Sequence, residues 1–280
     1  MLFDIHVHMG QYFDDYYTPP RILRTLRAAG ISHFAYSSTS TIVTDDAGFL
    51  QDERIAMHEL SNGRAKPILW VTHDMLKMFR DLSLYMDDAG GKIIGLKVHG
   101  VSEPWEPFGK DLKRVFDIAK EYKIFVMLHT GEHEECEAGM YRQICKAYSN
   151  VPVVLAHGRP LLKSIQMLKE YPNTYVDTSF MPHEHLRVLL KFARELGFTD
   201  RILFGTDTPI PERHLKSSLP RHLRARIATS KQIAGKDWKK ISWDNANRLL
   251  QGMIRQAHQP TLPRNDGMNF TNPMSKAILL

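Results

Sequence analysis

The sequence predicts an α/β fold, a single-domain (β/α)8 TIM barrel, and three observations lead to it. Strand and helix signals alternate eight times along the chain. Several strands are continuous apolar runs, such as Val153-Val154-Leu155, which are typical of parallel strands buried on both faces. Histidine or aspartate closes or follows four of the strands, and such barrels carry their catalytic groups at that rim.

The elements follow in order along the chain. The expected strands span residues 2–8, 32–38, 67–72, 93–99, 123–129, 151–157, 173–179 and 201–206. The expected helices span residues 19–29, 49–61, 75–87, 109–122, 138–149, 160–171, 183–196 and 221–234. In the helix 109–122, apolar residues recur at helical spacing and basic residues lie opposite. The longer loops, at 39–48, 100–108, 130–137 and 207–220, fall on the carboxyl rim and should shape a substrate pocket.

A chain of 280 residues is long enough for one such barrel, which we place at residues 1–254. Residues 255–280 carry three prolines and little periodicity, and we expect a C-terminal tail that packs on the barrel or reaches a neighbouring subunit of a homodimer. Because the first strand is expected to begin at residue 2, we expect no cleavable signal peptide. No apolar run approaches the ~18 residues that span a bilayer. Two isolated cysteines, Cys136 and Cys145, fit a reducing compartment, and we expect a cytoplasmic protein with no membrane partner.

The formal net charge of +6 is unevenly distributed. Between His214 and Lys240 the only acidic residue is Asp237, against seven basic ones: Lys216, Arg221, Arg224, Arg226, Lys231, Lys236 and Lys239. The segment is either a solvated helix face or a source of positive potential that draws an anionic small-molecule substrate toward Asp207. Nucleic acid is not expected as a partner, because the segment lacks interleaved aromatic residues and a known binding motif.

Four residues at strand ends form a candidate metal site. His6 and His8 alternate along the first strand and therefore point to one face. His129 closes the fifth strand, and Asp207 follows the eighth. Three or four such nitrogen and oxygen ligands with one open position make a catalytic zinc site, in which the pKa of a bound water drops from about 15.7 toward about 7. We therefore expect a divalent metal, zinc first and manganese as the alternative, with Asp207 also serving as general base.

Three further residues of the strand ends have open roles. His157 is the second catalytic candidate: it polarises a carbonyl and stabilises an oxyanion, or it ligates a second metal. Lys97 is paired with a carboxylate such as Asp4, or it is carbamylated and bridges two metals. His99 shares a strand face with Lys97 and either lines the pocket or only begins a loop.

Four residues are candidates for substrate binding. Arg159, Arg213 and Arg221 could hold a carboxylate, because a guanidinium binds one bidentately, although each also fits a plain surface position. Trp105 either caps a ligand or is an exposed loop residue.

Five segments together resemble the amidohydrolase superfamily, in particular its amidohydrolase 2 branch of amidohydrolase-related hydrolases and decarboxylases. They are Asp4-Ile5-His6-Val7-His8, Leu96-Lys97-Val98-His99, Leu128-His129-Thr130-Gly131, Ala156-His157-Gly158 and Phe204-Gly205-Thr206-Asp207-Thr208-Pro209. The segment Asp244-Asn245-Ala246-Asn247-Arg248-Leu249-Leu250 also resembles the one that ends this family's barrel. The resemblance spans about residues 2–250.

The resemblance implies that His6, His8, His129 and Asp207 are metal ligands. It implies that His157 is the histidine that assists catalysis in mononuclear members without always binding metal. Decarboxylases of this branch often carry Glu-x-His where this chain has His-x-His, which leaves decarboxylation open. The related deoxyribonucleases carry a glutamate near the position of Lys97, and its absence counts against nuclease activity.

Three functions follow from these residues. The leading hypothesis is hydrolysis of a small, carboxylate-bearing lactone, ester or amide by metal-activated water. The competing hypothesis is non-oxidative decarboxylation of an aromatic or unsaturated acid at the same metal. The third is a barrel that binds a ligand or partner without catalysis. Hydrolysis and decarboxylation use the same metal ligands, so the sequence does not separate them.

Overall fold

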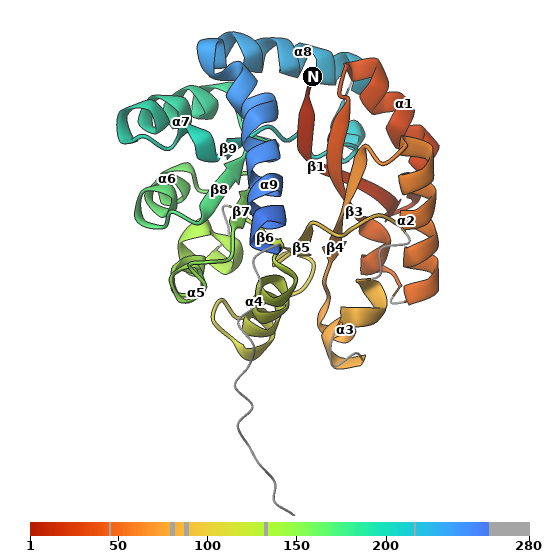
Figure 1. Cartoon of the computed structure of the whole chain (residues 1–280). Helices are drawn as coiled ribbons and strands as arrows, with labels where there is room; N and C mark the ends of the chain where they lie inside the picture. Colours follow the sequence, from red (N-terminus) through yellow and green to blue (C-terminus); the bar gives the residue numbers. More distant parts are fainter. Residues whose placement is uncertain (45, 79–81, 87–89, 132–133, 216, 258–280) are drawn as a thin grey trace, which may run out of the picture.

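A closed barrel of parallel strands forms the centre of the protein, and helices surround it (Figure 1). The computed structural model describes residues 1–257 except 45, 79–81, 87–89, 132–133 and 216. The strand order is β2-β1-β3-β4-β5-β6-β7-β8-β9, in which β2 pairs antiparallel with β1 and every other pair is parallel. The barrel closes where Val7 bridges Thr208 and the Asp207 N–H donates to the His6 carbonyl oxygen at 2.8 Å.

Eight of the strands confirm the predicted (β/α)8 fold. The strands are β1 (Phe3–Tyr12), β2 (Asp15–Tyr17), β3 (His33–Ser38), β4 (Ala65–Trp70), β5 (Gly95–Val98), β6 (Phe125–His129), β7 (Val153–Ala156), β8 (Thr174–Asp177) and β9 (Ile202–Leu203). The sequence did not indicate β2, which forms because β1 continues past His8 and turns back as a hairpin. The pairing of β1 with β3 shifts register between Asp4 and Val7, next to His6.

Eight helices of the described chain overlap the predicted ranges, and α9 follows the last of them. They are α1 (Pro19–Ala29), α2 (Ala47–Ser61), α3 (His73–Met78), α4 (Lys110–Tyr122), α5 (Arg142–Ala147), α6 (Leu161–Glu170), α7 (His183–Leu196), α8 (Leu219–Ala234) and α9 (Asn245–Ala257). Short 3-10 turns include η1 (Thr39–Ile42), η2 (Leu82–Tyr85), η4 (Ala138–Tyr141) and η6 (Ile210–His214). The predicted helix at 75–87 overlaps α3 and η2, and the one at 138–149 overlaps η4 and α5.

Local sequence explains where α1 begins and ends. The Thr18 side chain accepts a hydrogen bond from the Arg21 N–H, and prolines occupy the first two helical positions, which need no N–H donor. Gly30 ends the helix in the left-handed conformation, at φ 84°, where a side chain would be strained.

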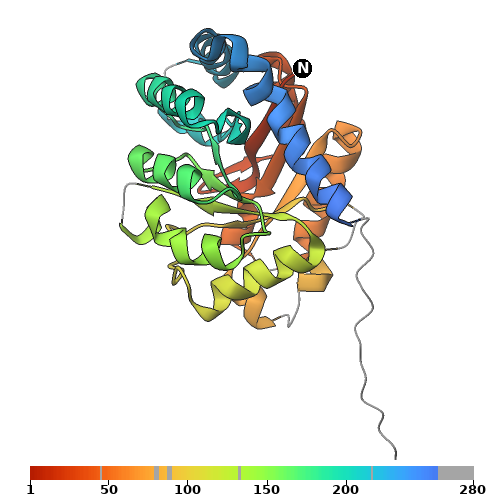
Figure 2. The same ribbon diagram turned by 60° about the vertical axis from the view of Figure 1, so that its left-hand side comes forward.

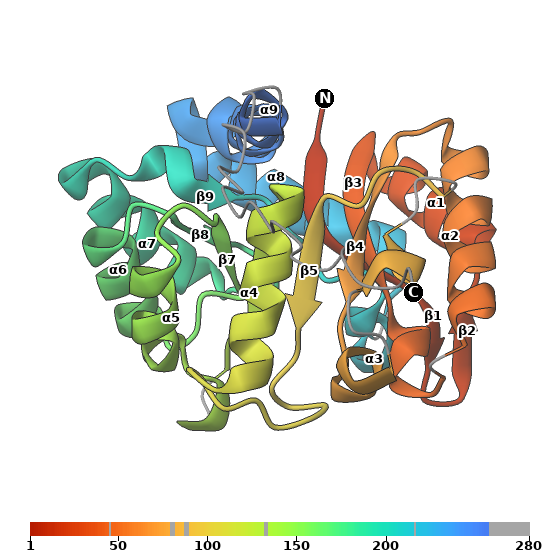
Figure 3. The same cartoon turned by 60° about the horizontal axis from the view of Figure 1, so that its bottom comes forward.

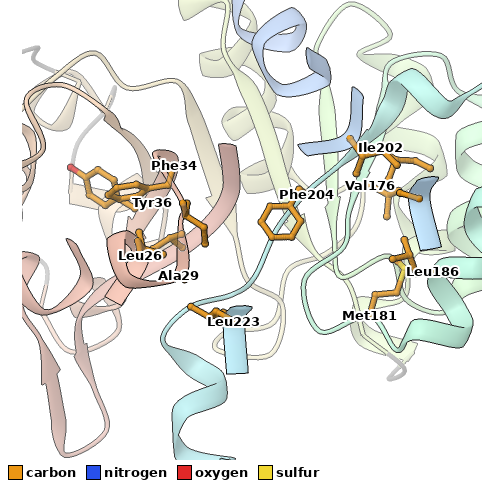
Figure 4. Close-up of a cluster of buried hydrophobic side chains, with 14 of the residues drawn as sticks. Leu26, Ala29, Phe34, Tyr36, Val176, Met181, Leu186, Ile202, Phe204 and Leu223 are labelled. Carbon is orange, nitrogen blue, oxygen red and sulfur yellow. The ribbon is translucent and has the colours of Figure 1, made fainter. Parts of the chain in front are cut away.

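The outer helices surround the strands (Figure 2), and buried apolar side chains in two clusters pack between helices and strands. In Figure 4, Leu26 and Ala29 of α1 lie beside Phe34 of β3, and Leu186 of α7 lies near Val176 of β8. These side chains are all buried. Burial of these clusters fixes the rotation of each strand and therefore which residues face the barrel interior.

The amino end of the barrel is closed by α9. Ala246 and Leu249 pack with Phe3 and Ile5 in the interior cluster, and Phe3 makes an edge contact with Trp243. Figure 3 shows α9 at the end of the barrel where the strands begin, away from their arrowheads. A polar site is therefore left to the carboxyl end.

The structure bears on the predicted domain boundary and on the expected absence of a membrane span in different ways. The boundary between barrel and tail at residue 254 stays a prediction, since α9 runs to Ala257 and residues 258–280 lie outside the described part. No helix among the described residues is long and apolar enough to cross a membrane.

Candidate metal centre and active site

Three of the predicted ligands meet at the carboxyl end of the barrel. His6 and His8 come from β1, and Asp207 follows β9. Their ligand atoms converge: His6 Nε2 is 3.2 Å from His8 Nε2, and Asp207 Oδ1 is 3.1 Å from the first and 2.9 Å from the second. All three side chains are buried. Gly205 leaves room for His6 and for Asp177, because a Cβ there would meet the Cβ atoms of these two residues at 3.2 and 3.3 Å.

The hydrogen bonds leave Nε2 of His6 facing the other two ligand atoms without a proton. His6 Nδ1 lies 2.8 Å from Asp177 Oδ2, so Nδ1 carries the proton of the neutral ring. Burial, followed by the charge of Lys97, lowers the pKa of His6 and keeps the ring neutral. His8 Nδ1 contacts the Ser37 hydroxyl at 3.0 Å, which holds the second ring in place.

Asp177 also connects His6 with His157. Its Oδ1 accepts from the backbone N–H groups of His157 and Ser179, at 3.1 and 2.9 Å, and from the Ser179 hydroxyl. Because the single Ser179 proton is donated to Asp177, the Ser179 oxygen accepts from His157 Nδ1 at 2.8 Å. Neutral His157 therefore carries its proton on Nδ1 and presents Nε2 as an acceptor.

His129 and His99 lie together along the next part of the rim. Their ring centroids are 4.0 Å apart, and His99 stacks on Trp70 at 4.9 Å. Burial, together with neighbouring positive charge, lowers the pKa of His129 to about 3. Its Nδ1 is buried and has no hydrogen-bond partner among the described residues, so the ring has a nitrogen available for a further group.

Lys97 from β5 lies beside the ligand cluster. Its Nζ is 2.6 Å from His6 Nε2, and burial lowers the pKa of the amine to about 8. The anticipated partner, Asp4, instead accepts hydrogen bonds from the Thr206 hydroxyl and from the His6 and Thr206 N–H groups. Whether Lys97 is carbamylated stays a prediction.

The donor set fits a divalent cation. A tetrahedral ion with bonds of about 2.0–2.2 Å keeps its ligand atoms roughly 3.3–3.6 Å apart, close to the 2.9–3.2 Å separations of His6, His8 and Asp207. The lone pair of His6 Nε2 and the Asp207 carboxylate oxygen, packed this closely, repel one another unless a positive charge balances them, and Lys97 Nζ lies 2.6 Å from His6 Nε2. Asp207 is buried, and burial raises its pKa, so a positive charge nearby also favours its ionised form.

A second group of potential ligand atoms belongs to His6, His157 and Asp177, within 4.8 Å of one another. Hydrogen bonds already engage these atoms, and a carboxylate on the far nitrogen of a ligating histidine orients that ligand. We interpret the group as support for one ion. His129 joins neither group of the described residues, and its role as a fourth ligand stays a prediction.

The site opens into a cavity of about 600 Å³. Its walls carry His8, Lys97, His99, His129, His157 and Asp207 together with Trp70, Arg159 and a set of apolar side chains. His157 and Asp207 both have positive φ, at 68° and 61°, a strained conformation for residues with side chains. Such strain persists where the surrounding structure holds it, commonly at functional sites.

The candidates for substrate binding separate in space. Arg159 lines the cavity and donates through Nη2 to the Phe180 carbonyl oxygen at 2.8 Å. Arg213 lies over the ring of Phe13 at the mouth, 4.5 Å from its centroid. Arg221 is exposed on α8, and Trp105 is buried against His73 at 4.2 Å; neither lines the cavity. Trp70 is the tryptophan that does.

The basic segment after Asp207 has mainly structural contacts. None of its described members lines the cavity. Arg226 donates to the carbonyl oxygens of Thr178 and Met181, and Arg224 donates to that of Ala28. Positive charge inside the cavity comes from Lys97 and Arg159 instead.

Asp177 and Ser179 are the site residues that sequence reasoning missed. Asp177 ends β8, so the rule that found His129 also applies to it. The predicted strand ran to residue 179 and hid that position at the rim.

Comparisons with known proteins give a fold and a family. Three solved structures share the barrel: a probable 2-pyrone-4,6-dicarboxylic acid hydrolase from Acinetobacter baumannii with citric acid bound, an amidohydrolase II, and a 2,6-dihydroxybenzoate decarboxylase complexed with 2,6-dihydroxybenzoate. Their TM-scores are 0.63, 0.66 and 0.63, at 16%, 18% and 15% identity. The alignments cover 89%, 90% and 90% of this chain and 99%, 100% and 99% of the others.

No curated protein matches the sequence. A family profile described as Amidohydrolase matches residues 3–252, which include every strand of the barrel and every residue of the ligand cluster. The chain therefore belongs to the amidohydrolase 2 family.

Proposed function

We propose that this protein is a metal-dependent hydrolase of a small, carboxylate-bearing lactone, ester or amide. The observation that carries the proposal is the convergence of His6 Nε2, His8 Nε2 and Asp207 Oδ1 within 3.2 Å at the buried end of a cavity. We propose zinc as the ion, with manganese as the alternative, because the donors are imidazole nitrogen and carboxylate oxygen. Cys136 and Cys145 are buried and form no disulfide among the described residues, in keeping with the proposed cytoplasmic location.

His6, His8 and Asp207 would hold the ion, with His129 as the further candidate. The ion would supply acidification of a water and polarisation of a carbonyl oxygen. Asp207 would take the proton of the attacking water and pass it to the leaving oxygen or nitrogen as the C–O or C–N bond breaks. Lys97 would stabilise negative charge developing on the carbonyl oxygen.

The hydrogen bonds favour a different role for His157 than oxyanion stabilisation. A neutral ring with its proton on Nδ1 has no second N–H to donate, and burial lowers the pKa of His157 well below its ordinary value. His157 would therefore accept a hydrogen bond at Nε2, for instance from the attacking water. Arg159 forms no ion pair with an acidic side chain among the described residues, and it would hold the substrate carboxylate.

One observation favours decarboxylation as the second candidate. Trp70 and Phe180 contribute aromatic surface to the cavity, and a carboxylate that loses its hydration there is destabilised relative to neutral carbon dioxide. The C–C bond would break as carbon dioxide leaves, and its electron pair would take a proton from Asp207, whose pKa burial raises.

Metal analysis is the first test. We expect one divalent ion per chain. At a free zinc concentration 100-fold above its Kd, binding should raise the free energy of unfolding by about 2.7 kcal/mol. His6→Ala should abolish this gain, while the exposed His185→Ala should leave it unchanged. Failure of the wild type to retain or to take up any divalent ion would reject the proposal.

The reaction type needs a separate measurement. A panel of lactones, esters, amides and aromatic acids is offered to the loaded protein in ¹⁸O-labelled water. Label in the product identifies hydrolysis, and released carbon dioxide identifies decarboxylation. Binding of a panel member without turnover would point to the barrel that only binds ligand.

A further inference from the structure

The cavity is polar at its base and apolar at its mouth. Four large apolar side chains line the mouth and are largely exposed to solvent: Phe13 at 68%, Val43 at 64%, Val101 at 60% and Ile42 at 46%. They come from three separate parts of the chain: the β1–β2 turn, η1 with the residue after it, and the loop after β5.

This gathering differs from scattered surface hydrophobics. The described residues include twelve exposed large apolar side chains, and a third of them surround this one opening. Single exposed apolar residues need no explanation, but a contiguous patch marks a binding surface. Because this apolar patch is continuous with the catalytic cavity, we infer that a ligand bound in the cavity also covers the patch.

Phe13 is held in position although little of it is buried. Its φ is 53°, which is strained for a phenylalanine. The Gln11 side chain donates to its carbonyl oxygen, the Tyr12 ring lies 4.8 Å from its ring, and the Arg213 guanidinium lies 4.5 Å from its centroid. A held, exposed aromatic side chain can bind an apolar group without losing side-chain entropy.

We propose that the substrate is an acid with a sizeable apolar body, an aryl group or an alkyl chain of several carbons. The inference rests on the function proposed above. The reacting head reaches His8, Lys97 and Asp207, and the carboxylate lies against Arg159. The apolar body extends to Phe13, Val43 and Val101. A cavity of about 600 Å³ is in the range that holds drug-sized ligands, larger than a compact diacid requires.

The test measures binding of unreactive acids to the metal-loaded protein by calorimetry. The probes are acetate, butanoate, hexanoate, 4-phenylbutanoate and citrate. Full burial of a methylene is worth about 0.8 kcal/mol, so the Kd should tighten up to about fourfold for each added methylene. We expect 4-phenylbutanoate to bind more tightly than citrate.

Two variants locate the effect. Phe13→Ser combined with Val101→Ser should flatten the dependence of Kd on chain length. Leu162→Ser, on α6 and 70% exposed, removes an apolar side chain outside the cavity lining and should preserve it. Arg159→Met should weaken all the acids by a similar factor.

Several outcomes would overturn the inference. These are a Kd that ignores chain length, a slope unchanged in the Phe13/Val101 variant, or citrate as the tightest ligand. The wild type could also self-associate while the Phe13/Val101 variant is monomeric and keeps the same dependence of Kd on chain length. That result would assign the apolar mouth to a contact between subunits instead. A normal slope in a protein that takes up no divalent ion would reject the proposed hydrolase and leave the apolar-acid specificity standing.

Discussion

At the scale of single residues, Asp177 orders the protons of two histidines. One of its oxygens faces His6 Nδ1, and the other accepts from Ser179 and from the His157 backbone. Burial opposes ionisation of Asp177, but His6 and these hydrogen bonds outweigh it and lower the pKa of the carboxyl. A permanent carboxylate there fixes the tautomer in which His6 Nε2 is free to ligate.

Asp177→Asn tests this role directly. Asparagine keeps the shape but removes the charge and one acceptor, so we expect metal affinity to fall about 10- to 100-fold. Competition with a chromophoric chelator measures the Kd. The matched control is Asp200→Asn, a surface carboxylate paired with Arg248. A loss of less than twofold in the Asp177 variant would show that its carboxylate does not support the ion.

At the scale of elements, two arginines hold the loop between β8 and α7. Arg226 of α8 donates to the carbonyl oxygens of Thr178 and Met181, and Arg159 donates to that of Phe180. Ser179 lies within this loop, so the outer helix α8 positions a residue at the centre of the site. Phe180 has a positive φ of 51°, a conformation that these hydrogen bonds help to maintain.

Arg226→Met should therefore affect both stability and the site. Loss of two charge-assisted hydrogen bonds from a partly buried guanidinium should cost about 1–3 kcal/mol in the free energy of unfolding. Metal affinity should fall as well, because Ser179 and Asp177 lose their fixed geometry. Urea titrations and the chelator assay measure the two effects. Arg224→Met, on the same helix but bonded to Ala28, should change stability alone; equal behaviour of the two variants would contradict the positioning role.

At the scale of the whole molecule, the barrel buries a group of titratable side chains at its carboxyl end. Burial lowers the pKa of five histidines: His6, His8, His99, His129 and His157. The unfolded chain takes up protons at these positions below about pH 6.5, and the native chain resists until lower pH. For His129 the window runs from pH 6.5 down to about 3. Stability is therefore lost as pH falls through this window.

The metal-free protein should accordingly lose stability between pH 7 and pH 5. Each histidine contributes a slope of up to about 1.4 kcal/mol per pH unit. Asp4 and Asp207 act in the opposite sense, since burial raises the pKa of both carboxyls, that of Asp4 to about 7, but the five histidines outnumber them. Urea titrations at several pH values measure the slope, and His129→Gln should reduce it. A free energy of unfolding that stays constant or rises on acidification would contradict the prediction.

The sequence by itself determined the barrel and the residues at its rim. Alternation of strand and helix signals fixes the fold class, and the period of a strand places His6 and His8 on one face. Because parallel strands end at one rim, His129, His157 and Asp207 were assigned there without coordinates. Bounds were less certain, as Asp177 shows: a predicted end two residues too late concealed a rim carboxylate.

Only the tertiary structure decided which of these side chains meet. The contact of His6 with Asp177 spans 171 residues of sequence. The hydrogen bond from Arg226 to Thr178 joins α8 to the loop between β8 and α7. Such contacts depend on strand order, twist and helix packing, which local periodicity does not encode. For the same reason the sequence could not choose Trp70 over Trp105, or Arg159 over Arg221, as cavity residues. The packing of the surrounding helices and strands determines whether each of these side chains faces the cavity.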